Sequence, residues 1–140
     1  MSCLFCERKE FVLENEAGYA IYDENPVSLG HMLIIPKKHV THFFEADENL
    51  RIKLFELVDI AKRMLDNQYH PDGYNIGMNC GEMAGQSIMH LHIHLIPRYQ
   101  GIQLILKVVF VVSFQKKCTI KKGALLLEKQ SRPCSRKIFW

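Results

Sequence analysis

Short apolar stretches bounded by turn residues recur along the first hundred residues. Four of them predict strands: residues 17–26, 30–39, 73–79 and 88–97. The first stretch closes at Asn25-Pro26, a dipeptide that favours a turn. The second ends at Pro36, which has no N–H to donate within a sheet. The last is distinguished by histidines at alternate positions.

One longer segment, residues 47–69, has helical rather than strand periodicity. Its apolar residues recur three and four positions apart: Leu54, Leu57, Val58, Ala61, Met64 and Leu65. Asp47 and Glu48 suit an N-cap and a first turn. Strands and a long helix without an alternating βαβ order predict an α+β fold with an antiparallel sheet.

Composition limits the class of protein. The 140 residues suit one domain, and 48% are hydrophobic, which predicts a folded core. Five cysteines without regular spacing do not indicate a disulfide framework. We see no signal peptide, and the longest apolar run is too short to span a bilayer. We therefore expect a cytoplasmic protein that binds neither membrane nor nucleic acid.

Charge divides the chain near Gly101. Residues 1–100 hold nine Lys/Arg and fourteen Asp/Glu, a net charge of −5, whereas residues 101–140 hold nine Lys/Arg and only Glu128, a net charge of +8. We therefore predict a domain over residues 1–101 and an atypical basic, apolar segment over 102–140.

His90, His92 and His94 alternate in the last predicted strand, so their side chains share one face. A solvated face that happens to be rich in histidine is the less favoured interpretation. Two functional interpretations stay open. The three imidazoles could bind a catalytic metal with an open coordination position, or one could act as a nucleophile that the others orient.

The preceding loop favours the nucleophile. Gly85, Gln86 and Ser87 lead directly into the histidine strand, and their backbone N–H groups and hydroxyl suit a phosphate. The histidine strand carries no carboxylate to complete a metalloenzyme site.

Two blocks of sequence resemble the histidine triad (HIT) family. "GQSIMHLHIHLIPRY" is similar to its signature of three alternating histidines, and "YDENPVSLGHMLIIPKKH" to its upstream block. The resemblance covers residues 3–100, roughly 70% of the chain. It implies a five-stranded antiparallel sheet with one long and one short helix, paired into a continuous sheet in a homodimer.

The family resemblance also implies an activity. Its members act on the α-phosphate of nucleoside phosphoramidates or dinucleoside polyphosphates, so we expect a purine nucleotide substrate and a hydrolase with a nucleotidyl-histidine intermediate. A nucleotide-binding module with little turnover, and a metallohydrolase using all three histidines, are the alternatives. No organic cofactor is implied.

Site residues follow from the resemblance, position by position. His92 matches the family nucleophile, His94 the histidine that binds phosphate, and His31 a supporting histidine. The other matches concern substrate: Asp23 for the ribose, Ile21 for the base, and Asn79, Gly85, Gln86 and Ser87 for phosphate, with Ser87 near the leaving group. Without the resemblance, Asp23 and Asn79 would be read as turn residues and Ile21 as core.

Cys3 and Cys6 form a Cys-x-x-Cys pair, which alone supplies too few ligands for a structural zinc site. A redox role would need a thioredoxin-like context, which the sequence lacks. The family resemblance implies that His39 and His90 complete a Cys₂His₂ zinc site, with His42 as a competing candidate.

The resemblance stops at Gly101, where family members continue with a segment similar to GDTIDPKGGVRGVIPEKKM. Deleting one base from codons for that segment yields residues 102–116 as they stand. We therefore hypothesise that residues 102–140 are an out-of-frame translation. A genuine basic segment that binds a partner is the alternative, and the nucleotide sequence decides between them.

Overall fold

The computed structural model describes residues 2–101. The predictions made for residues 102–140 lie outside this described part of the chain. Within it, five strands form one sheet: β1 (Leu13–Glu14), β2 (Gly18–Tyr22), β3 (Met32–Pro36), β4 (Gly73–Gly77) and β5 (Ile93–Arg98). Their order is β1-β2-β3-β5-β4, with every neighbouring pair antiparallel, as the predicted α+β class requires.

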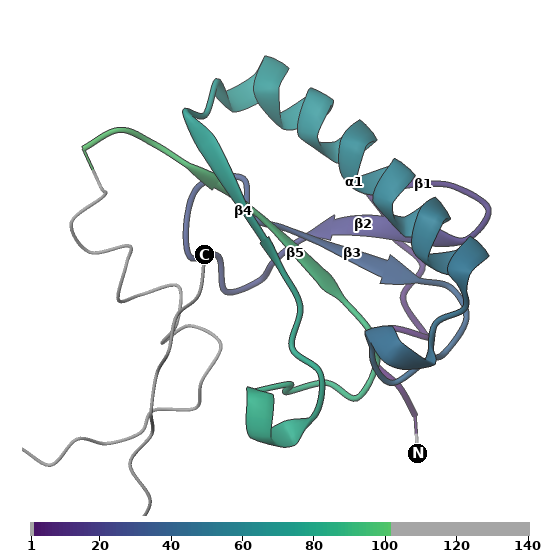
Figure 1. Ribbon diagram of the computed structural model, residues 1–140. Coiled ribbons are helices and arrows are strands. Elements are labelled where there is room, and N and C mark those ends of the chain that lie inside the picture. The colour runs from purple at the N-terminus through teal and green to yellow at the C-terminus, as the bar shows by residue number, and fades with distance from the viewer. Residues whose placement is uncertain (1, 102–140) are drawn as a thin grey trace, which may run out of the picture.

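The helix α1 (Glu48–Tyr69) packs across one face of this sheet (Figure 1). Asp47 caps it, because its side chain accepts the Leu50 N–H at 2.8 Å. The helix buries one face: Leu50, Leu54, Leu57, Val58, Ala61 and Leu65. Met64, predicted on this face, is only partly buried against the same cluster. Two three-residue 3₁₀-helices, Phe43–Glu45 and Glu82–Ala84, occur in the connecting loops.

The two faces of the sheet have different roles. On the helix face, Ala20, Met32 and Ile34 pack with the helix into the main core. On the opposite face, a smaller apolar cluster contains Phe5, Tyr19, Ile21, Leu33 and Ile35. Since side chains alternate along each strand, the same strands supply both the core and a second surface.

The histidine strand begins later than predicted. The sequence suggested residues 88–97, but only Ile93–Arg98 pair in the sheet. Residues just before β5 are held instead by the hydrogen bond from Leu91 N–H to the Val40 carbonyl. Leu91 nevertheless joins the helix-face core with Ile93 and Leu95, so the predicted alternation persists. In the part of the chain that the structure describes, no helix is both long and apolar enough to cross a membrane.

Candidate active site and metal centre

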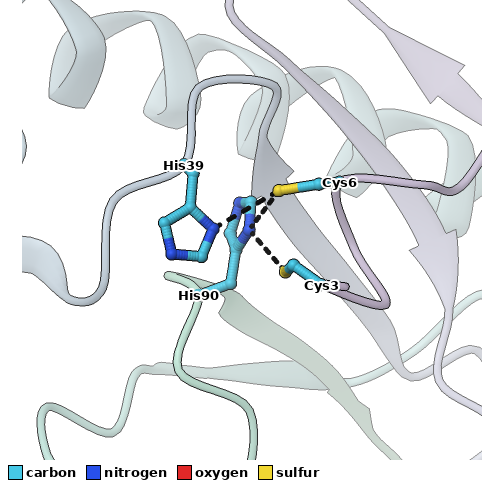
Figure 2. A group of neighbouring side chains, drawn as sticks. All are labelled: Cys3, Cys6, His39 and His90. Carbon is cyan, nitrogen blue, oxygen red and sulfur yellow. Dashed lines mark hydrogen bonds between the residues drawn. The ribbon is translucent and has the colours of Figure 1, made fainter. Parts of the chain in front are cut away.

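Cys3, Cys6, His39 and His90 converge at one end of the sheet (Figure 2). His90 Nδ1 lies 3.3 Å from Cys3 Sγ and 3.5 Å from Cys6 Sγ, and His39 Nδ1 lies 3.3 Å from Cys6 Sγ. A tetrahedral zinc ion at ordinary bond lengths separates its sulfur and nitrogen ligands by about 3.5 Å. The four side chains therefore fit a Cys₂His₂ metal site.

The surroundings of His90 also suit a metal ligand. Its imidazole is fully buried, and Nε2–H donates to the Pro36 carbonyl at 2.9 Å, which leaves the Nδ1 lone pair directed at the two sulfurs. Such a backbone bond to the distal nitrogen is typical of metal-binding histidines. Burial lowers the pKa of His90 and so favours the neutral ligand form. Desolvation and the neighbouring Cys3 raise the pKa of Cys6.

A pocket opens beside this cluster, on the face of the sheet opposite α1. Its lining consists of Leu4, Phe5, Arg8, Ile21, Asp23, Glu24, Asn25, Leu33, Ser87, Ile88, His92 and His94. Five residues predicted from the sequence therefore meet in one cavity: Ile21, Asp23, Ser87, His92 and His94.

His92 has a defined tautomer in this pocket. Its Nδ1 lies 2.8 Å from the His90 carbonyl oxygen, so Nδ1 carries the proton that this bond needs. The remaining nitrogen, Nε2, then holds a lone pair. Phe5 packs edge-on against His92, with ring centroids 5.5 Å apart, and restrains the imidazole. Burial lowers the pKa of His92, against the opposing effects of the His90 hydrogen bond and Asp23, so the ring is neutral at neutral pH.

A second pair of histidines continues along the same face. His31 Nδ1 accepts the Val27 N–H at 3.3 Å, so its proton lies on Nε2 and is donated to His94 Nδ1 at 2.9 Å. His94 consequently carries its own proton on Nε2. Burial, with smaller contributions from His92 and His31, lowers the pKa of His94 to about 3. Gly30, with φ of 83°, makes the turn that places His31 here.

Asp23 faces this histidine pair. Its Oδ2 lies 3.5 Å from His31 Nε2 and 3.9 Å from His94 Nδ1, while its Oδ1 accepts the Asn25 N–H at 2.8 Å. Burial lowers the pKa of His31, and Asp23 partly opposes this effect. The arrangement is a hydrogen-bonded row that holds neutral imidazoles beside one carboxylate.

Three predicted phosphate contacts lie outside the pocket lining. The Asn79 amide is buried and donates to the Ala84 carbonyl. The Gln86 side chain is buried too; it accepts the Gly81 N–H at 2.7 Å and donates to the Thr41 and Ile88 carbonyls. These amides stabilise the loop that presents Ser87. Gly85 ends the 3₁₀ turn with φ of 85°.

Sequence reasoning missed the N-terminal wall of the pocket. Leu4, Phe5 and Arg8 flank or lie between the two cysteines, and they reach the cavity where the Cys/His cluster brings this segment over the sheet. The position of the Cys-x-x-Cys pair was the sequence feature that could have indicated this wall. No pattern in the sequence connects Arg8 with Glu24, which lies across the pocket.

The fold, the row of histidines and the Cys/His cluster together define a histidine triad architecture. The model of the HIT domain family matches residues 7–101, and the chain belongs to this family. Protein hit from Bacillus subtilis is 36% identical over 104 residues, covering 70% of this chain and 72% of that protein.

Two further relatives bear on chemistry. AP-4-A phosphorylase from Mycobacterium tuberculosis is 32% identical over 91 residues, which are 64% of this chain and 47% of that protein. The crystal structure of a zinc-bound histidine triad family protein from Mycobacterium smegmatis superposes with a TM-score of 0.67 at 30% identity, covering 74% of this chain and 79% of that one.

Proposed function

We propose that this chain is a nucleotide hydrolase that works through a covalent nucleotidyl-His92 intermediate. The observation that carries the proposal is the bond from His92 Nδ1–H to the His90 carbonyl, which leaves Nε2 unprotonated in a pocket. An imidazole activated in this way needs no separate general base.

The reaction has two steps. In the first, the His92 Nε2 lone pair forms a bond to the α-phosphorus, and the bond from phosphorus to the leaving group breaks. Ser87 lines the same pocket and is the residue we assign to the leaving group. In the second, water attacks phosphorus, the phosphorus–nitrogen bond breaks, and a nucleoside monophosphate leaves with neutral His92 restored.

His94 stabilises the charge that develops on the phosphoryl oxygens. Its proton lies on Nε2 because Nδ1 accepts a hydrogen bond from His31. A fixed N–H donor stabilises an oxyanion without reorganising. We propose His31 as the residue that maintains this tautomer, and Asp23 as the acceptor for ribose hydroxyls.

The substrate class is a purine nucleotide bearing a leaving group on its α-phosphate. Ile21 and Leu33 provide an apolar floor for the base beside the polar Asp23. A relative named AP-4-A phosphorylase supports a dinucleoside polyphosphate as one such substrate. Asn79, Gly85 and Gln86 then act by holding the Ser87 loop in place.

We also propose that Cys3, Cys6, His39 and His90 bind a structural zinc ion. Four protein ligands make a closed site, which suits a structural rather than a catalytic ion. The zinc-bound relative supports this choice of metal. Elemental analysis of purified protein tests it: about one zinc per chain is expected, and a chain that is equally stable without any zinc contradicts it.

A homodimer with a continuous sheet is our proposal for assembly. Among the described residues, β4 pairs only with β5, and Ile76 on this edge strand is 48% exposed. Exposed edge strands readily pair with another strand. Light scattering coupled to gel filtration measures the mass in solution; a monomeric mass would contradict the proposal.

We retain residues 1–101 as the proposed domain.

Turnover assays test the catalytic proposal. We expect the chain to hydrolyse diadenosine tetraphosphate or adenosine 5′-phosphoramidate, and His92→Ala to abolish turnover. Binding without turnover would indicate a nucleotide-binding module. Activity that survives His92→Ala but disappears on chelation would indicate a metallohydrolase instead.

A further inference from the structure

Arg8 and Glu24 form an ion pair across one end of the pocket, with Arg8 Nη1 3.0 Å from Glu24 Oε1. We propose that this pair recognises the edge of the nucleotide base and gives the site a preference for guanine over adenine. The proposal rests on the nucleotide-binding function above and extends it to the identity of the base.

The sheet register shows which end of the pocket the pair occupies. Ile21 pairs with Leu33, and Leu33 pairs with His94, so these three residues form one row across β2, β3 and β5. Two strand spacings, about 10 Å, therefore separate the backbone of β5 from that of β2. Glu24 is the second residue after the end of β2 and is adjacent in sequence to Asp23, the residue proposed to accept the ribose hydroxyls.

A nucleotide whose α-phosphate meets His92 and whose ribose meets Asp23 would place its base over β2 and β3, within reach of Glu24. The faces of the base would pack on the apolar Leu4, Ile21 and Leu33, all of which line the pocket. Beyond them, the lining offers charged groups from two separate segments, Arg8 from the N-terminal turn and Glu24 from the turn after β2. The edge of the base is the part of the nucleotide that reaches them.

The pair keeps spare hydrogen-bonding capacity. Within the described residues, the bond between Arg8 Nη1 and Glu24 Oε1 is the single hydrogen bond of either side chain. Arg8 thus has donors left on Nε and Nη2, and Glu24 has lone pairs left on both Oε2 and Oε1. The side chain of Arg8 is 29% exposed and that of Glu24 is 70% exposed, so an added bond is partly shielded from water on the arginine side only.

The chemistry of this pair fits guanine better than adenine. Guanine presents an acceptor, O6, beside two donors, N1–H and N2–H, on one edge; an arginine beside a carboxylate matches all three. Adenine presents one donor and one acceptor on that edge, so the same pair makes one charge-assisted bond fewer. Among the described residues that line the pocket, Arg8 is the one lysine or arginine.

Binding of the two monophosphates measures the preference without requiring turnover. By calorimetry, we expect GMP to bind the full chain about tenfold more tightly than AMP, the scale of discrimination by one good arginine–base contact. Arg8→Gln and Glu24→Gln should each bring the two dissociation constants within about twofold. Lys53→Gln, which breaks an ion pair with Glu16 away from the pocket, is the matched control and should keep the preference.

Each contrary outcome has a distinct meaning. Equal affinity for GMP and AMP in the unmodified chain overturns the base-recognition proposal, and leaves the nucleotide-binding function intact. A uniform loss of both affinities in Arg8→Gln also overturns it, because it places Arg8 on phosphate. If the chain binds neither nucleotide, the proposed function fails as well. Circular dichroism of each variant checks that its fold is retained.

Discussion

His94 makes the stability of the fold sensitive to acid. Its pKa is lowered to about 3 by burial and by His92 and His31, against 6.5 for an exposed histidine. Below pH 6.5 the unfolded chain therefore binds a proton that the folded chain excludes, so lowering the pH lowers the free energy of unfolding. The pH value 4.5 lies two units below 6.5, and each unit lowers the free energy of unfolding by about 1.4 kcal/mol. His94 alone therefore lowers the free energy of unfolding by about 3 kcal/mol at pH 4.5 relative to pH 7.5.

Urea unfolding at a series of pH values measures this cost. We expect His94→Gln to flatten the decline in unfolding free energy between pH 6.5 and 4.5 by about 3 kcal/mol relative to the unmodified chain. Glutamine cannot titrate, so it removes the excluded proton. His70→Asn is the control: His70 is exposed at the end of α1 with φ of 50°, a conformation that asparagine tolerates.

Parallel pH profiles for His94→Gln and the unmodified chain would refute this reasoning. They would mean that His94 accepts a proton in the folded state without cost. The bond from His31 Nε2–H to His94 Nδ1 would then not describe the resting site.

Three other predictions concern stability and metal. Leu57→Ala should lower the unfolding free energy by about 2–5 kcal/mol in urea titrations, since Leu57 is fully buried on the face of α1 that packs against the sheet; a loss under 1 kcal/mol would contradict that packing. Asp47→Ala should cost about 1 kcal/mol through loss of the cap on Leu50 N–H, and Asp47→Asn much less, by thermal unfolding. Cys6→Ser should reduce bound zinc measured by elemental analysis and lower the melting temperature, whereas Cys80→Ser, outside the cluster, should change neither.

Local patterns predicted most of the fold. Helical spacing of apolar residues located α1 within one residue at its N-terminal end, because burial against the sheet and the Asp47 cap agree. The two-residue β1 carries too little sequence for any periodicity and is defined by its pairing with β2. The start of β5 was also missed, because alternation continues through Leu91 although pairing with β3 begins later.

The site was predictable where a single motif contains the reactive residues and strand alternation fixes the face on which they lie. Alternation placed His92 and His94 on the pocket face, and the family resemblance separated His90 from them as a metal ligand, an assignment consistent with its distances to Cys3 and Cys6. The opposite wall was not predictable, since Arg8 and Glu24 meet only through tertiary folding. Gln86 shows the opposite case. It is close in sequence to the pocket residues, but its side-chain amide bonds to the backbone of Gly81 and Thr41 and does not line the pocket.

The central claim is that His92 forms a covalent bond to the α-phosphate. Intact-protein mass spectrometry after rapid acid-free quenching of a reaction with adenosine 5′-phosphoramidate tests it most directly. We predict a mass increase equal to one adenylyl group, located on His92 by peptide mapping and absent from His92→Gly. Turnover with no adduct on the unmodified chain, or an adduct of the same extent on His92→Gly, would contradict the account.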